Sequence, residues 1–272
     1  MSWGSAASTA NSLPVSVLDR PAVFETMRVY SGRIAAFDRH LRRLAGSAKT
    51  AGIGPIVEKT LAARTLEAVE RSGCPDAIAR LSVHAPAGRT AITGCSVRPF
   101  AGFPRDWYDR GARITTASVR RADVRSSCAQ VKGNDYVNAI GAILNVPKKL
   151  DAAFSADPMF LTAAGEVSET TVANILIIRD GALWTPPAVC GILLGVTRGL
   201  ALECARSLGL EVRETPFTRH DLFNAAEVFL TNAAVEILPV IEADGRRIGS
   251  GRPGPWSARL REAYLKASLA RR

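Results

Sequence analysis

The 272-residue sequence contains few cysteines and few histidines, and their spacing excludes several classes of site. The five cysteines are odd in number and form no CxxC pair, so the sequence predicts neither a disulfide framework nor a zinc site. This usage is typical of a reducing compartment, and we expect a cytoplasmic protein. The three histidines, His40, His84 and His220, are spread apart without metal-ligand spacing, so no metal is expected.

Long apolar runs are also missing. The longest stretches, such as residues 173–178, are far shorter than the roughly 20 apolar residues that a membrane-spanning helix needs. The N-terminal stretch MSWGSAASTANSLP is small and polar, without the basic and then apolar segments of a secretory signal. We therefore expect no membrane partner.

Acidic residues are outnumbered, because 25 aspartates and glutamates oppose 35 lysines and arginines, which gives a net charge of +10. Such a balance can indicate nucleic-acid binding. However, the basic residues are dispersed, aromatic residues make up only 6% of the chain, and no RRM, zinc-finger or homeodomain motif is present. We expect a solvated basic surface that attracts anionic substrates, and we keep a nucleic-acid-binding protein as the alternative from another class.

Turn residues at three places predict β-hairpins. The pairs Ser31-Gly32, Asp180-Gly181 and Asp244-Gly245 each separate two runs of strand-forming residues. Each pair places a residue that tolerates a turn before a glycine, which can take up positive φ without a steric penalty.

Apolar residues that recur every three or four positions predict the helices. One follows Asp38 as its N-cap, a second ends at Gly73, another covers about residues 136–150, and the last begins at Pro255. Strands and helices are mixed without strict alternation, so the predicted fold class is α/β of the α+β type.

One stretch interrupts this periodicity. Residues 101–112, AGFPRDWYDRGA, combine glycine, proline and charge, which favours a domain boundary. We therefore expect two domains, residues 1–110 and 111–272.

Five segments carry residues of chemical interest beyond the fold. They read VFETMRVYSGRIAAFDRHLRRLAGSAKTAGI, QVKGNDYVNAIGAILNV, GEVSETTVANILIIRDGALWTPP, GILLGVTRGLALECARSLGLEVRE and AAEVFLTNAAVEILPV. In this order, from about Val23 to Tyr264, the chain resembles the class IV aminotransferases. These are pyridoxal-phosphate enzymes that include branched-chain aminotransferases, D-amino-acid aminotransferases and aminodeoxychorismate lyases. The resemblance implies the fold-type-IV architecture, with a small N-terminal and a larger C-terminal α/β domain, the cofactor between them, and a homodimer.

The resemblance assigns the catalytic role to Lys132. It matches the lysine that forms the Schiff base with pyridoxal 5'-phosphate. Such an amine must be neutral near pH 7, attack the cofactor aldehyde and then carry the proton of the substrate Cα, and burial lowers its pKa. Tyr136 matches, with a one-residue difference in length, the tyrosine that branched-chain members place on the cofactor phenolate oxygen.

The resemblance also implies the residues that hold the cofactor ring and phosphate. Glu169 matches the glutamate that faces the pyridine nitrogen and keeps it protonated, and Asn174 matches a position that shapes the adjoining turn. Arg43 matches the arginine of the HLxRL segment, whose planar fork suits a phosphate. Four further positions complete the expected phosphate site: the backbone N–H groups of Val196 and Thr197 at a helix N-terminus, and Asn232 with Ala233 in a second loop.

Departures from the family pattern concern the substrate and leave the cofactor site untouched. The entry LDRPAVFET is short and lacks the usual glycines, Leu194 replaces a proline, and Asn232 favours the lyase. His84 lacks the arginine two residues earlier that D-amino-acid members use for the substrate carboxylate. We expect an aminotransferase that acts on an amino acid, with a branched-chain amino acid as the first choice, and on a 2-oxo acid. The alternatives are an aminodeoxychorismate lyase and a non-catalytic family member.

Overall fold

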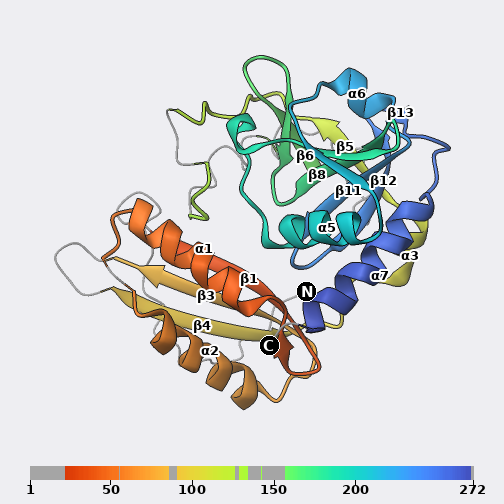
Figure 1. Ribbon diagram of the computed structural model, residues 1–272. Helices are drawn as coiled ribbons and strands as arrows, with labels where there is room; N and C mark the ends of the chain where they lie inside the picture. Colours follow the sequence, from red (N-terminus) through yellow and green to blue (C-terminus); the bar gives the residue numbers. More distant parts are fainter. Residues whose placement is uncertain are drawn as a thin grey trace, which may run out of the picture.

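The structure is a computed structural model, and it describes residues 22–54, 56–85, 91–125, 129–133, 142 and 157–270. Two sheets organise these residues (Figure 1). The elements outside the sheets are α1 (Phe37–Thr50), α2 (Glu58–Ser72), α3 (Arg105–Arg110), η1 (Ala188–Cys190), α5 (Val196–Ser207), α6 (Arg219–Phe223) and α7 (Pro255–Ala270).

The first sheet is antiparallel, with the strand order β2-β1-β3-β4. Its strands are β1 (Ala22–Tyr30), β2 (Arg33–Ile34), β3 (Ala77–His84) and β4 (Ile92–Pro99). Alternate residues of β1 point to opposite faces, and Val23, Met27 and Val29 form one core with Leu44 of α1 and Leu61 of α2. Both helices therefore cover the same face of this sheet.

The second sheet closes into a ring. In the order β8-β11-β12-β5-β6-β7, each strand pairs with the next, and β7 pairs back with β8. The ring consists of β5 (Ala112–Thr116), β6 (Asp157–Leu161), β7 (Val167–Thr170), β8 (Asn174–Arg179), β11 (Glu227–Asn232) and β12 (Glu236–Ala243). Strands β9 (Ala182–Thr185), β10 (Glu211–Glu214) and β13 (Arg246–Arg247) extend it. The pair that closes the ring is Glu169 with Asn174, two of the residues singled out in the sequence.

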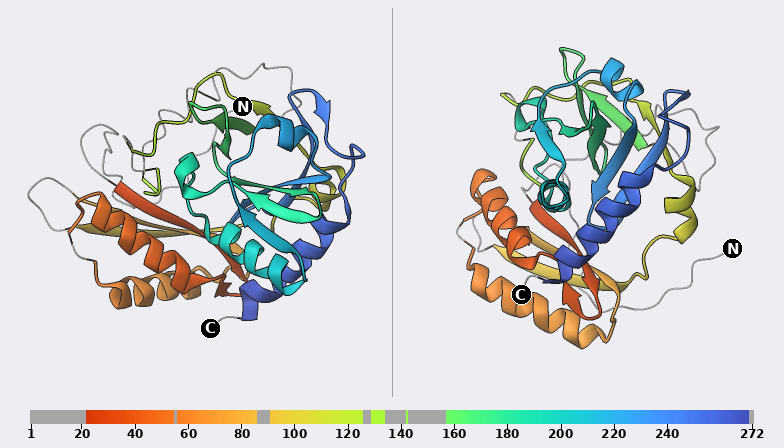
Figure 2. Two further views of the ribbon diagram at one scale, coloured as in Figure 1. Left: turned by 45° about the horizontal axis from the view of Figure 1, so that its top comes forward. Right: turned by 45° about the vertical axis from the view of Figure 1, so that its right-hand side comes forward.

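Two helices connect the sheets. Helix α5 faces α1, where Arg39 Nη2 lies 2.8 Å from Glu203 Oε1. Helix α7 packs on α5 and β12, and its C-terminal end lies beside the β1–β2 hairpin in each view (Figures 1 and 2). Among the described helices, none combines the length and the apolar character needed to cross a bilayer.

Most of the local predictions are confirmed. Ser31, Asp180 and Asp244 and the glycine after each have positive φ, as tight hairpin turns require. Helix α2 ends at Ser72 before Gly73, which has φ 62°, and α7 begins at Pro255.

One cap was predicted wrongly. Helix α1 begins at Phe37, and its N-cap is Ala36 with φ 48°, whereas Asp38 lies in the first turn and pairs with Arg42 at 2.6 Å. The short β2 ends at Ile34, and the left-handed Ala36 turns the chain into the helix before Asp38 is reached.

Two further predictions meet the structure only in part. The helix expected at about 136–150 lies outside the described residues. The boundary stretch 101–112 contains the short helix α3, and it connects the last strand of the first sheet to the first strand of the second. The division into residues 1–110 and 111–272 remains a prediction.

Candidate active site

One cavity, of about 270 Å³, collects the residues singled out in the sequence. We call it the lysine cavity. Eight of the nine candidates line it, namely Arg43, Lys132, Glu169, Asn174, Val196, Thr197, Asn232 and Ala233. The ninth, Tyr136, lies outside the described residues. Segments from both sheets and from the N-terminus of α5 meet there.

Lys132 is held against the first sheet. The Phe24 N–H donates to the Lys132 carbonyl at 3.0 Å, the Lys132 N–H donates to Ser47 Oγ at 3.3 Å, and Gly133 bridges to Val23. The side-chain nitrogen Nζ lies 4.8 Å from the centre of the Phe24 ring. Burial, followed by the positive charge of Arg43, lowers the pKa of Lys132 to about 8. A sizeable share of this amine is therefore neutral near physiological pH.

Glu169 is a buried carboxylate with three donors. Arg121 Nη2 donates to Oε1 at 2.7 Å, and Asn174 Nδ2 and the Leu193 N–H donate to Oε2 at 2.9 and 3.0 Å. Burial raises the pKa of Glu169 to about 7, although Arg121 and Leu193 oppose this shift. Because all three donors favour the ionised form, a further cation in the cavity would complete its ionisation.

The N-terminus of α5 opens onto the same cavity. Its N-cap is Gly195, it has no side-chain cap, and Gly195, Val196 and Thr197 line the space. The first N–H groups of a helix have no partner within it, and the helix dipole favours an anion there. A side chain at Gly195 would collide with Asn174 Oδ1, so the close approach of this turn requires glycine. The Thr197 hydroxyl does not cap the helix but is hydrogen-bonded to Tyr264 of α7.

Arg43 lies at the cavity, and most of its donors are already used. Its Nε and Nη2 donate to the two oxygens of Glu25 at 2.7 and 2.6 Å, and Nη1 donates to the Leu194 carbonyl at 3.1 Å. His40 Nδ1 lies 2.7 Å from Glu25 Oε2. Burial opposes ionisation of Glu25, but the hydrogen bonds from Arg43 and His40 lower its pKa to about 2. A guanidinium has five N–H groups, so two remain for a ligand.

A second loop completes the lining. Asn232 Oδ1 accepts from the N–H groups of Ala234 and Val235, both at 2.8 Å, and Nδ2 donates to the Val172 carbonyl at 3.2 Å. The Asn232 side chain therefore connects two cavity-lining loops. Beside it, Thr231 Oγ1 is buried without a hydrogen-bond partner.

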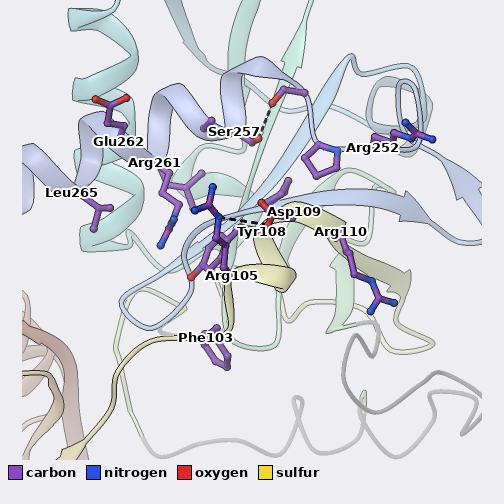
Figure 3. Close-up of a pocket in the computed structure, with 15 residues that line it drawn as sticks. Phe103, Arg105, Tyr108, Asp109, Arg110, Arg252, Ser257, Arg261, Glu262 and Leu265 are labelled. Carbon is purple, nitrogen blue, oxygen red and sulfur yellow. Dashed lines mark hydrogen bonds and ion pairs between the residues drawn. The ribbon is translucent and has the colours of Figure 1, made fainter.

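A larger cavity of about 1160 Å³ lies elsewhere, between α3, β12 and α7 (Figure 3). The side chains drawn there include Arg105, Arg110, Arg252 and Arg261, together with Tyr108 and Phe103. Its described lining contains no lysine, so it offers no amine for covalent chemistry.

Sequence reasoning missed three groups that shape the lysine cavity: Glu25, Arg121 and Thr231. Glu25 shows a recognisable pattern, because it is an acidic residue on the inward face of the otherwise apolar strand β1. Arg121 shows none, since it lies in a basic stretch 48 residues before its partner Glu169.

The comparisons with known proteins agree with this geometry. A family profile described as "Amino-transferase class IV" matches residues 22–243. The chain belongs to the class IV aminotransferases. A Methanocaldococcus jannaschii protein, provisionally named a branched-chain-amino-acid aminotransferase, is 33% identical over 267 residues, which cover 92% of this chain and 90% of that protein. The D-alanine aminotransferase of Listeria innocua is 29% identical over 276 residues, covering 94% and 91%.

Solved structures show the same architecture. A branched-chain amino acid aminotransferase with pyridoxamine 5'-phosphate, from the source abbreviated T.th., matches this aminotransferase with a TM-score of 0.83 and 29% identity, covering 93% of this chain and 86% of that one. The fold is therefore that of the fold-type-IV aminotransferases, as predicted. Class IV aminotransferases use pyridoxal phosphate, and the predicted cofactor is confirmed.

The lysine cavity fits this cofactor chemically. An aldehyde needs the amine of Lys132, and a pyridine nitrogen needs a buried carboxylate such as Glu169. A phosphate needs N–H and hydroxyl donors, and the α5 N-terminus and the unpartnered Thr231 hydroxyl supply them.

Proposed function

We propose that this aminotransferase transfers the amino group of a branched-chain or similar aliphatic L-amino acid to a 2-oxo acid. One observation carries the proposal. The amine of Lys132, with its pKa lowered to about 8, shares a cavity with Glu169, a buried carboxylate held by Arg121. This pairs a base that can take a proton from carbon with a group that stabilises a cationic ring.

The aliphatic preference is supported by what surrounds the amine. The Phe24 ring is 5% exposed and lies beside Lys132 Nζ, and Val172 projects at the cavity rim with 64% of its surface exposed. Ala233 and Ala234 add small apolar groups. Contact with such surfaces favours a substrate with an apolar side chain.

The residues divide the chemistry among them. Pyridoxal phosphate, when bound, supplies the aldehyde that accepts the amino group and the ring that takes up the electron pair left at the substrate Cα. In our proposal Lys132 Nζ takes the α-proton as a base. Glu169 keeps the ring nitrogen protonated, while Asn174 holds Glu169 Oε2 and the Leu193 carbonyl in place. Tyr136 keeps its proposed place at the phenolate oxygen.

The phosphate site is proposed to combine three contributions. The N–H groups of Val196 and Thr197 are placed at the α5 N-terminus, and Arg43 retains two N–H groups beyond those bound to Glu25 and Leu194. Asn232 and Ala233 contribute the loop beyond the Thr231 hydroxyl. In this arrangement Asn232 acts through its turn, because its side chain is already occupied.

Assembly and location complete the proposal. We expect a homodimer, and the face of the first sheet opposite α1 and α2 supports this, because alternate residues of β4 from Ile92 to Arg98 are exposed there. The absence of a CxxC pair supports a cytoplasmic location. Light scattering on the purified protein tests the dimer.

The deciding experiment is the visible absorbance of the wild type and of Lys132→Ala, before and after addition of L- and D-amino acids. We expect a cofactor band that only aliphatic L-amino acids convert to the pyridoxamine form, and Lys132→Ala should lack the band of the lysine-bound cofactor. Conversion only by D-amino acids would refute the stereochemistry. Pyruvate released from aminodeoxychorismate without a 2-oxo acid would instead establish the lyase. A wild type that binds no cofactor would refute the proposal altogether.

A further inference from the structure

The hairpin between β11 and β12 contains an unusual residue. Asn232 pairs with Glu236, so the loop between the strands is only residues 233–235. Glu236 has φ 58°, in the left-handed region. Three-residue hairpin loops usually place glycine in that conformation, because a Cβ makes it unfavourable. Here the position has a long acidic side chain that is 4% exposed.

The Glu236 carboxylate joins two elements that lie far apart in the sequence. Its Oε1 accepts from the Tyr30 hydroxyl at 2.7 Å, at the end of β1 in the first sheet. Its Oε2 accepts from Arg261 Nε at 2.6 Å, on α7. Burial raises the pKa of Tyr30 well above its ordinary value, so the hydroxyl stays protonated and remains a donor. Both carboxylate oxygens are therefore held by charged or buried donors.

A second contact fixes the residue before Glu236. The Arg261 guanidinium stacks on the Tyr108 ring at 3.8 Å, and Figure 3 shows these two side chains together at the edge of the larger cavity. The Tyr108 hydroxyl donates to the Val235 carbonyl at 3.2 Å. The loop is thus braced from outside by β1, α3 and α7.

The other side of the same loop forms a wall of the lysine cavity. Asn232, Ala233 and Ala234 line that cavity, and the Asn232 side chain connects the loop to Val172 on the opposite rim. Any displacement of the backbone at Glu236 therefore moves groups that face the ligand.

We propose that Glu236 is a positioning residue, whose bonds to Tyr30 and Arg261 hold the hairpin in its left-handed turn and so set the place of Asn232–Ala234 at the cavity. This role rests on the proposed function of that cavity. Strain maintained by surrounding contacts is characteristic of functional loops, and the tilt of one such loop by a fraction of an ångström alters ligand geometry.

The test compares Glu236→Gln and Glu236→Gly with Glu242→Gln, the control on the same strand, whose carboxylate pairs with Arg113 at 3.5 Å on the surface. Glutamine keeps the shape but can accept through one atom only, so one donor loses its partner. Glycine removes both bonds and also relieves the strain. We expect both Glu236 variants to fold, to need more pyridoxal phosphate for saturation, and to lose about 10- to 100-fold in kcat/KM, mainly through a higher KM. Glu242→Gln should match the wild type.

A brace that served stability alone would give a different result. The Glu236→Gly variant would then show wild-type KM and cofactor affinity together with a changed melting temperature, and this would overturn the proposal. If Glu236→Gly does not fold, Tyr30→Phe decides, because it removes one donor only. A raised KM in that variant supports the role, and an unchanged KM overturns it. A wild type without cofactor binding would instead refute the proposed function.

Discussion

Replacing Lys132 with methionine is expected to stabilise the cofactor-free protein near neutral pH, although it abolishes catalysis. Lys132 is a charged amine held in a mainly buried site, and burial is the largest cause that lowers its pKa to about 8. Methionine has a similar length and no charge, so it keeps the packing against Phe24 and removes the unfavourable charge.

The magnitude follows from the difference in pKa between the two states. The ordinary value is 10.5 and the folded value about 8, a difference that corresponds to about 3 kcal/mol. Because the folded state binds this proton less tightly, the charged amine destabilises the folded protein fully below pH 8. Stability is then regained as pH rises from about 8 to 10.5. The advantage of Lys132→Met should therefore be about 3 kcal/mol at pH 7 and should nearly vanish by pH 10.5.

Urea denaturation of the cofactor-free proteins at pH 7 and at pH 10.5 measures this difference. Lys59→Met, on the exposed first turn of α2, provides a control whose difference from the wild type should stay constant with pH. Other groups that titrate in this range are common to all three proteins and cancel. If Lys132→Met shows the same pH dependence as the control, the amine is not held in the buried, charged state that underlies this reasoning.

Three other substitutions test the remaining walls of the cavity. Arg121→Met leaves the Glu169 carboxylate without its ion pair, so its pKa should rise above 7, and the free energy of unfolding should fall by about 3 kcal/mol in urea denaturation. Gly195→Ala brings a Cβ onto Asn174 Oδ1, and we expect calorimetry to show a lower melting temperature, with about 1–3 kcal/mol of stability lost. Thr231→Val removes a buried hydroxyl that has no partner, so the cofactor-free protein should gain about 1 kcal/mol while titration shows weaker binding of pyridoxal phosphate. An unchanged cofactor affinity in Thr231→Val would exclude this hydroxyl from the phosphate site.

Local chemistry made part of this structure predictable. The three hairpin turns followed from a polar residue before glycine, and the end of α2 followed from Gly73, because positive φ is determined mainly by the residue itself. Ala36 shows the limit of this reasoning. Its left-handed conformation is imposed by the approach of β2 to α1, and no property of alanine indicates it.

The candidate site shows the same division. Motif order along the chain sufficed to bring Lys132 and Glu169 to one cavity, since each lies in a recognisable segment. Contacts between distant residues did not follow, because nothing near Tyr30 in the sequence indicates a partner 206 residues away in Glu236. Such pairings depend on how the two sheets pack, which local patterns do not encode.

The energetics of the lysine cavity follow from this separation of fold and site. The barrel closes through the pair Glu169 and Asn174, so the carboxylate sits on the ring itself and has little freedom to move to solvent. Lys132 and Glu169 both have pKa values shifted by burial towards their neutral forms, and the Thr231 hydroxyl in the same wall has no partner. Each of these groups disfavours the cofactor-free fold, and each matches a group of pyridoxal phosphate that would remove the penalty. A ligand that binds only the folded state stabilises it by mass action, so the instability built into this cavity is returned as cofactor affinity.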